Sequence, residues 1–281
     1  MSMRSSPRLV AAIARTTLAC ALAAAGGAHA AAIEASPANA ANKHIYVGQY
    51  DIYTNLWGIG GAGSGWYEYM YTNSTTAPSN AGWKWSGFAG DTTTVKSYPS
   101  IRKGGSNAQN DPAVSGLPYQ FGDNTRDVDV LWSFAPSGYD GTGNVSGTYN
   151  HAIDVFFHAG TVFDRAYLKA EIMVIPESSS ASQTQGWGIR DATPFVIDGE
   201  TWDVWHATMS SHGYSWPVMQ FRKRVMARYF NKNLRHFFAE AARRRPDVFL
   251  PAYYVSMVEA GTEVKSGSGK VHVNSYEVNV H

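Results

Sequence analysis

Short apolar runs separated by turn residues dominate the chain from His44 to its C-terminus. In several runs apolar and polar residues alternate, which is the pattern of a half-buried antiparallel strand. The intervening residues are mostly Gly, Ser, Asn and Pro, which favour turns. The pattern predicts strands within residues 45–53, 65–71, 127–134, 151–157, 169–175, 194–207, 253–264 and 270–280. Regularly spaced short strands with turn signals are typical of an all-β fold, either a β-sandwich or a jelly roll.

One segment, residues 217–246, breaks this pattern. Its apolar residues recur at helical spacing, as at Val218, Phe221, Val225 and Tyr229. We expect one or two helices that pack through this stripe against the outside of the sandwich. The segment also carries clusters of basic residues at 222–224 and 243–245. A nucleic-acid-binding surface is one explanation, but a solvated helix face is simpler, because nothing else in the chain points to nucleic acid.

The first 30 residues have the pattern of a secretory signal peptide. Arginines precede and enter an alanine-rich apolar stretch, which ends in the small-x-small sequence Ala28-His29-Ala30. Cleavage is expected after Ala30, and a lipoprotein signal ending at Cys20 fits less well. Residues 31–43 are rich in Ala and Asn and are predicted to be a disordered lead-in, which leaves 44–281 as one domain. We therefore expect the protein to be secreted, to the cell exterior or the periplasm.

Composition narrows the chemistry that the chain can perform. The single cysteine lies inside the signal segment, so the mature protein has neither a disulfide nor a thiol nucleophile. A net charge of +1 gives no reason to expect a nucleic-acid or membrane partner, and we expect a monomer. The sequence has no H-E-x-x-H motif and no G-x-S-x-G elbow, so we expect no metal, no other cofactor and no serine nucleophile. The 9 Trp and 16 Tyr suit the binding of sugar rings, although aromatic residues also fill cores.

Carboxylates inside predicted strands are the remaining candidates for chemistry. Alternation in KAEIMVI places Glu171 and Met173 on one face of the strand and apolar residues on the other. Asp154 in HAIDVFF has the same arrangement, as do Glu259 and Glu263 in SMVEAGTEV. Each strand thus has one face for a core and one face that carries an acid, as the lining of a cleft would. A single acid in a strand more often faces solvent or forms an ion pair, so the pattern alone leaves both explanations open.

An ordered series of motifs resembles glycoside hydrolase family 12, the small endo-β-1,4-glucanases and xyloglucanases. The motifs are TNLWG (54–58), VKSYPSI (95–101), YNHAIDVFF (149–157), AEIMV (170–174), TWDVW (201–205), YYVSMVEAGTEV (253–264) and KVHVNSYEVNV (270–280). Each motif is short, but their order covers the chain from about Tyr46 to the C-terminus.

This resemblance implies a jelly-roll β-sandwich of two curved antiparallel sheets around an open substrate cleft. It also implies hydrolysis of plant cell-wall glucans (cellulose, mixed-linkage glucan or xyloglucan) with retention of anomeric configuration. In that mechanism Glu171 corresponds to the nucleophile, Glu263 to the general acid/base and Asp154 to a supporting acid. The residues implied to bind substrate are Asn55, Trp57 and Met173.

Two departures from the family pattern leave the substrate preference open. Ile175 and Lys265 stand where the family usually has Trp, close in sequence to Glu171 and Glu263 respectively. A non-catalytic β-sandwich that binds polysaccharide without cleaving it is the main alternative, because it would share the aromatic cleft without requiring the acid pair. A related jelly-roll xylanase is disfavoured by the Asn-Leu-Trp-Gly and Lys-Ser-Tyr-Pro elements.

Overall fold

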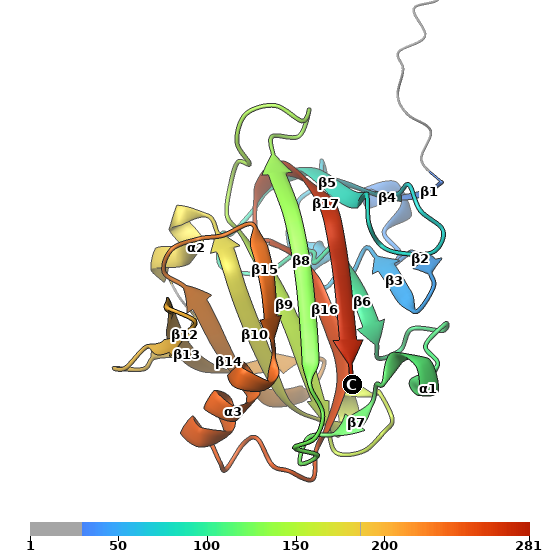
Figure 1. Ribbon diagram of the computed structural model, residues 1–281. Helices are drawn as coiled ribbons and strands as arrows, with labels where there is room; N and C mark the ends of the chain where they lie inside the picture. The colour runs from blue at the N-terminus through green and yellow to red at the C-terminus, as the bar shows by residue number, and fades with distance from the viewer. Residues whose placement is uncertain (1–29, 186) are drawn as a thin grey trace, which may run out of the picture.

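Two curved β-sheets pack face to face in the computed structural model, which describes residues 30–185 and 187–281 (Figure 1). The smaller sheet has six strands in the order β1 (Ala31–Ala35), β4 (Tyr67–Thr72), β5 (Ala81–Phe88), β17 (Gly267–Val280), β8 (Val128–Ser137) and β15 (Tyr229–Asn233). This architecture confirms the expected all-β jelly-roll sandwich.

The larger sheet has 11 strands and carries the candidate site. Its main path is β11 (Ile189–Arg190), β13 (Glu200–Ser211), β14 (Tyr214–Lys223), β10 (Leu168–Ser178), β9 (Tyr149–His158), β16 (Tyr254–Val264), β6 (Ser100–Gly104), β3 (Tyr50–Tyr53) and β2 (His44–Val47). Two further strands, β12 (Phe195–Ile197) and β7 (Tyr119–Gln120), pair with β13 and β16. The pairs are antiparallel except for β10 and β14, which run parallel because the chain returns to β10 through the β13–β14 hairpin.

Helices are short and few in the described part of the chain. They are α1 (Pro112–Ser115), α2 (Ser180–Gln185) and α3 (Arg235–Arg244), together with the 3-10 turns η1 (Pro37–Asn39), η2 (Ile59–Gly61) and η3 (Arg165–Tyr167). None of the described helices is long and apolar enough to span a membrane.

The core lies between the two sheets and is rich in aromatic side chains. Trp83, Trp85 and Trp132 of the smaller sheet are fully buried there, as are Phe157 and Phe221 of the larger one. Burial of such large apolar side chains stabilises the fold by about 1.5–3 kcal/mol each, before the entropy cost of ordering them.

The prediction that residues 31–43 form a disordered lead-in is wrong. Residues 31–35 form β1, which pairs antiparallel with β4 along its whole length, and Ala35 is fully buried. Small side chains fit here because the strand completes the edge of the smaller sheet through backbone hydrogen bonds, which need no large side chains. The predicted signal peptide lies outside the described residues, apart from Ala30.

The predicted helices at residues 217–246 are only partly confirmed. Residues 217–223 belong to β14, in which Val218 and Phe221 are both buried but on opposite faces of the sheet. A strand buried on both faces carries apolar residues at spacings that also fit a helix, which explains the error. Strand β15 follows, and only 235–244 is helical.

The helix α3 packs against the core and not against the outer surface of the sandwich as expected, because its apolar side chains join the core cluster. Its Phe237 ring contacts Trp202 and Phe221, with ring centroids 5.2 Å apart in both pairs. The basic side chains of the helix have acidic partners, since Arg243 and Arg244 both bind Glu240 at 2.7–2.8 Å. These residues are therefore part of a surface ion-pair network.

Candidate active site

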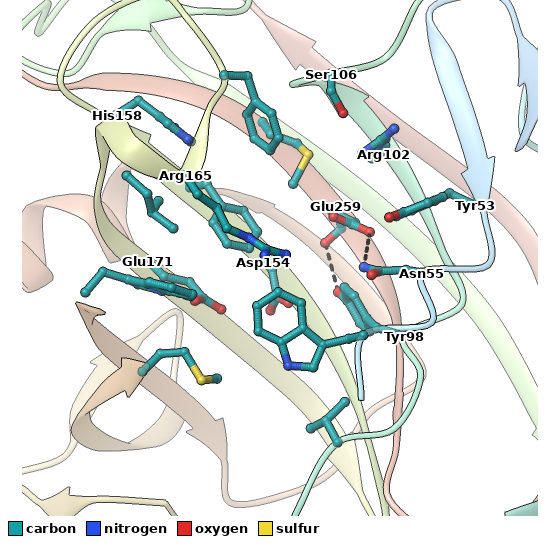
Figure 2. Close-up of a pocket in the computed structure, with 18 of the residues that line it drawn as sticks. Tyr53, Asn55, Tyr98, Arg102, Ser106, Asp154, His158, Arg165, Glu171 and Glu259 are labelled. Atoms are coloured by element: carbon teal, nitrogen blue, oxygen red, sulfur yellow. Dashed lines mark hydrogen bonds between the residues drawn. The ribbon is translucent and has the colours of Figure 1, made fainter. Parts of the chain in front are cut away.

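A cavity of about 200 Å³ opens on the face of the larger sheet that points away from the core (Figure 2). Its lining includes the carboxylic acids Asp154, Glu171, Glu259 and Glu263. Aromatic side chains form much of the remaining wall, among them Tyr53, Trp57, Tyr98, Phe156 and Trp216. Within the described residues no cluster of His, Cys, Asp or Glu is arranged to hold a metal ion.

Side chains alternate between the two faces of each strand, and this places the acids on the cavity side as predicted. On β10, Ala170, Ile172 and Val174 join the core, while Met173 and Ile175 join an apolar cluster on the opposite face, where Glu171 also lies. The same alternation applies to β9 and β16, whose core-facing residues flank Asp154 and Glu259.

Strand register sets the order of the acids across the sheet. Asp154 on the central strand β9 pairs with Met173 of β10 on one side and with Glu259 of β16 on the other. Glu171 pairs with Phe156, two residues from the Asp154 level, and Glu263 pairs with Asn150, four residues away in the other direction. The four carboxylates therefore come from three adjacent strands.

Glu171 is buried, and the charged groups that act on it are acids. Its pKa is raised to about 8: burial is the largest cause, the Trp216 hydrogen bond opposes the rise, and the charges of Glu263 and Glu259 contribute to it. The indole Nε1 of Trp216 donates a hydrogen bond of 2.7 Å to Glu171 Oε2. That bond fixes the orientation of the carboxylate and favours its ionised form.

Asp154 also tends to hold a proton. Burial and the charges of Glu171, Glu263 and Glu259 raise its pKa well above the usual value. Its Oδ1 atom is buried without a hydrogen-bond partner among the described residues. A proton on Asp154 relieves the repulsion from its neighbours and leaves Glu171 free to ionise.

Glu263 occupies a different, partly cationic environment. It is half-buried, and Asn150 Nδ2 donates a hydrogen bond of 2.6 Å to its Oε2. The Glu263 charge raises the pKa values of Lys265 and Arg222, against the burial that lowers both. Asn150 is itself held by the hydroxyl of Ser182, whose carbonyl accepts from Arg222 at 3.1 Å.

The Asn-Leu-Trp-Gly element lies at the opposite wall of the cavity. Asn55 has a φ of 41°, a left-handed conformation that Asn tolerates better than most residues, and its carbonyl accepts from Trp57 and Tyr98. The Trp57 indole contacts Trp216 edge to face, with centroids 6.3 Å apart. The Arg165 guanidinium lies over the Trp57 ring, 4.9 Å from its centroid.

The Lys-Ser-Tyr-Pro element contributes Tyr98 to the cavity wall and supports the strands that carry the acids. Lys96 Nζ donates to the carbonyl of Lys265 at 2.6 Å, close to Glu263 in the chain. The Tyr98 hydroxyl contacts the backbone carbonyls of Ala152 and Glu259 at 3.0 and 3.2 Å, and so ties β9 to β16 at the level of the acids (Figure 2 shows the Glu259 contact).

A family model described as glycosyl hydrolase family 12 matches residues 48–281. The chain belongs to this family. Endoglucanase S of Pectobacterium parmentieri is 28% identical over 254 residues, with 88% of each chain covered. Xyloglucan-specific endo-beta-1,4-glucanase A of Aspergillus niger is 26% identical over 264 residues, which cover 88% of this chain and 95% of that protein.

Solved structures of the family share the fold. The family 12 xyloglucanase from Bacillus licheniformis superposes with a TM-score of 0.74 at 28% identity, covering 90% of this chain and 100% of that one. Endoglucanase 3 of Trichoderma harzianum has a TM-score of 0.69 at 19% identity, a likeness that concerns the fold alone.

Of the six residues carried over from family 12, five line the cavity and one does not. Asn55, Trp57, Asp154, Glu171 and Glu263 belong to the lining. Met173 lies on the expected face of β10, but it is buried in the apolar cluster with Trp216 and Val218 and is not part of the lining. Packing against β14 covers this side chain.

The two departures from the family 12 pattern both lie near cations. Ile175 pairs with Arg222 of β14, which is only 2% exposed. Lys265 is half-buried and electrostatically coupled to Glu263. Ile175 and Lys265, which stand where Trp was expected, thus lie at or beside a positive charge on the Glu263 side of the site.

Sequence reasoning missed three residues with direct roles in the geometry. Trp216, which binds Glu171, was not recognised because it stands beside the segment predicted to be helical. Asn150, which binds Glu263, stands four residues before Asp154 and so shares its face of β9, which was the available signal. Glu259 was placed on the correct face but given no role.

Proposed function

We propose that this family 12 glycoside hydrolase is an endo-acting enzyme that cleaves internal β-1,4-glucosidic bonds of plant cell-wall glucans with retention of configuration. The observation that carries the proposal is the convergence of Glu171, Asp154 and Glu263 in one aromatic-lined cavity. One relative is named an endoglucanase and another a xyloglucan-specific endo-beta-1,4-glucanase, which supports a glucan substrate and includes xyloglucan among the candidates.

Glu171 acts as the nucleophile. Its ionised carboxylate attacks the anomeric carbon, and the bond to the leaving oxygen breaks as the glycosyl-enzyme ester forms. Trp216 holds the attacking group, and the proton kept by Asp154 prevents two adjacent carboxylates from both being charged. This arrangement compensates for the burial that disfavours ionisation of Glu171.

Glu263 acts as the general acid and then as the general base. It donates its proton to the leaving oxygen, and in the second step it removes a proton from the water that hydrolyses the ester. The two carboxyls of a retaining enzyme lie about 5–5.5 Å apart, which suits direct attack without an intervening water. Asn150 orients Glu263, and Trp57 and Asn55 bind the sugar on the other side of the bond.

The signal-peptide pattern at the N-terminus supports export of the enzyme. We infer that it acts outside the cytoplasm, where plant polysaccharide is accessible. Fractionation of cells that express the full chain, followed by N-terminal sequencing of the exported protein, tests this location.

Sugar release from a panel of polysaccharides tests the activity. Reducing ends are measured on carboxymethylcellulose, barley glucan, xyloglucan and xylan with the wild type, Glu171→Gln, Glu263→Gln and the exposed control Glu277→Gln. We expect release from one or more glucans, loss in both site variants and no change in the control. Equal release by the wild type and Glu171→Gln would contradict the assignment, and binding without release would favour a non-catalytic polysaccharide-binding protein.

The stereochemistry of the first product tests retention separately. Nuclear magnetic resonance spectra recorded within minutes of mixing should show the β-anomer before mutarotation. Initial accumulation of the α-anomer would show inversion instead.

A further inference from the structure

The fourth acid of the cavity, Glu259, has no part in the mechanism described above. It lines the cavity, is 2% exposed and lies directly opposite Asp154 across the β9–β16 pair. An acid is costly to bury unless its polar atoms find partners, so the position of Glu259 beside Asp154 calls for an explanation.

Glu259 binds protein through one of its two oxygens. Asn55 Nδ2 donates to Glu259 Oε1 at 3.4 Å, and the hydroxyl of Ser100 donates to the same atom (Figure 2 shows the Asn55 contact). The other oxygen, Oε2, takes no hydrogen bond from the residues that the structure describes. One oxygen is thus fixed and the other is available to a ligand.

The nearest cation is already neutralised by another acid. Arg102 pairs with Glu259 in register, but its guanidinium donates to Asp51 Oδ2 at 2.6 and 2.8 Å. It also lies over the Tyr53 ring, 4.4 Å from the centroid. The charge of Arg102 therefore partly offsets that of Glu259, but Arg102 does not bind the free oxygen of Glu259.

We propose that Glu259 is a sugar-binding and positioning residue, which orients Asn55 through Oε1 and accepts a hydroxyl hydrogen bond of the Trp57-bound sugar through Oε2. Trp57 and Asn55 belong to one short loop, and Glu259 lies on the sheet floor beside it, so a ring that stacks on Trp57 presents its hydroxyl edge to both polar groups. A carboxylate accepts such hydroxyl bonds about twice as strongly as a neutral group. This role rests on the proposed function for the position of the sugar.

Binding measured without turnover tests the proposal. In the Glu171→Gln background, calorimetry with cellohexaose and with a xyloglucan oligosaccharide compares Glu259→Ala, Glu259→Gln and the exposed control Glu277→Ala. We expect Glu259→Ala to weaken binding about 10- to 100-fold, as for loss of hydrogen bonds to a charged group. Glu259→Gln retains an acceptor for Asn55 and Ser100, so its loss should be smaller, and the control should bind like its parent.

A double-variant cycle tests the positioning part. If Asn55 acts through Glu259, then Asn55→Ala combined with Glu259→Ala should weaken binding little more than Glu259→Ala alone, whereas independent groups would give multiplied losses. Thermal unfolding of each variant identifies a general folding defect, and in that case Glu259→Gln alone decides.

Three results separate the two proposals. Unchanged binding in a folded Glu259→Ala or Glu259→Gln variant overturns the role of Glu259. Binding by the parent without hydrolysis by the wild type overturns the proposed function alone. A parent that binds neither oligosaccharide overturns both.

Discussion

The two proposed catalytic glutamates share one cavity but stand in opposite electrostatic surroundings. Around Glu171 the charged neighbours are acids, among them Asp154 on the adjoining strand β9 and Glu259 on the next strand, β16. Around Glu263 the neighbours include Lys265 and Arg222, and an amide donor binds the carboxylate. Two identical side chains are thus given different surroundings by their positions in the sheet.

Replacing each of the two glutamates in turn should have the largest effect and tests most strongly whether they have different roles. Glu171→Gln removes the nucleophile and should lower kcat on the order of 10⁴-fold or more, as loss of a nucleophile does in other hydrolases. Glu263→Gln removes proton transfer and should cost about 10²- to 10⁴-fold. Initial rates on the preferred glucan measure both, and a smaller loss for Glu171→Gln than for Glu263→Gln would reverse the assigned roles.

The free energy of unfolding, measured as a function of pH, should report the raised pKa of Glu171 directly. The pKa of Glu171 is about 8 in the folded protein against 4.5 as its ordinary value, so the folded state holds an extra proton between these values. The stability that this proton confers is complete below about pH 4.5 and is lost as pH rises through 8, by up to about 1.4 kcal/mol per pH unit.

Glu171→Gln should therefore raise the melting temperature at pH 8 and leave it nearly unchanged at pH 4.5. Thermal unfolding across this range measures the effect, with Glu277→Gln as the exposed control. If the melting temperatures of the wild type and Glu171→Gln changed with pH in the same way, ionisation of Glu171 would not destabilise the folded protein.

Removing the amide contact sharpens the comparison on the Glu263 side. Asn150→Ala deletes the 2.6 Å hydrogen bond to Glu263, so the acid/base loses its orientation. We expect a loss in kcat of about 10-fold, near the value of one hydrogen bond to a charged group. Steady-state kinetics should show kcat falling more than KM rises, and an unchanged kcat would mean that strand position alone orients Glu263.

Lys265→Met should have the smallest effect. Lys265 is half-buried and interacts electrostatically with Glu263, whereas the Asn150 hydrogen bond to Glu263 does not depend on it. A partly exposed ion pair contributes about 0.2–1 kcal/mol, so kcat should fall by about 5-fold or less when the cation is removed. A larger fall in steady-state kcat, comparable with that of Asn150→Ala, would contradict this ranking.

Sequence patterns predicted the parts of the site that depend on local alternation. The faces of β9, β10 and β16, and hence the exposure of four acids to one cavity, follow from a period of two residues. The pairing of strands that are far apart in the sequence could not be predicted from alternation along each strand. Trp216 reaches Glu171 only because β14 lies parallel to β10, and strand β1 was hidden because its pairing with β4 requires no apolar pattern.

The parallel pairing of β10 with β14 has a consequence for the order in which the protein assembles. After β10 the chain forms α2 and strands β11 to β13 before β14 returns to pair with β10, so Glu171 receives its indole partner from a residue 45 positions later. Contacts of this separation form slowly, because the loop must close before the pairing stabilises it. Enzymatic activity should thus be regained later in refolding than the antiparallel hairpins form, because the nucleophile is not held by its indole partner until β14 has paired with β10.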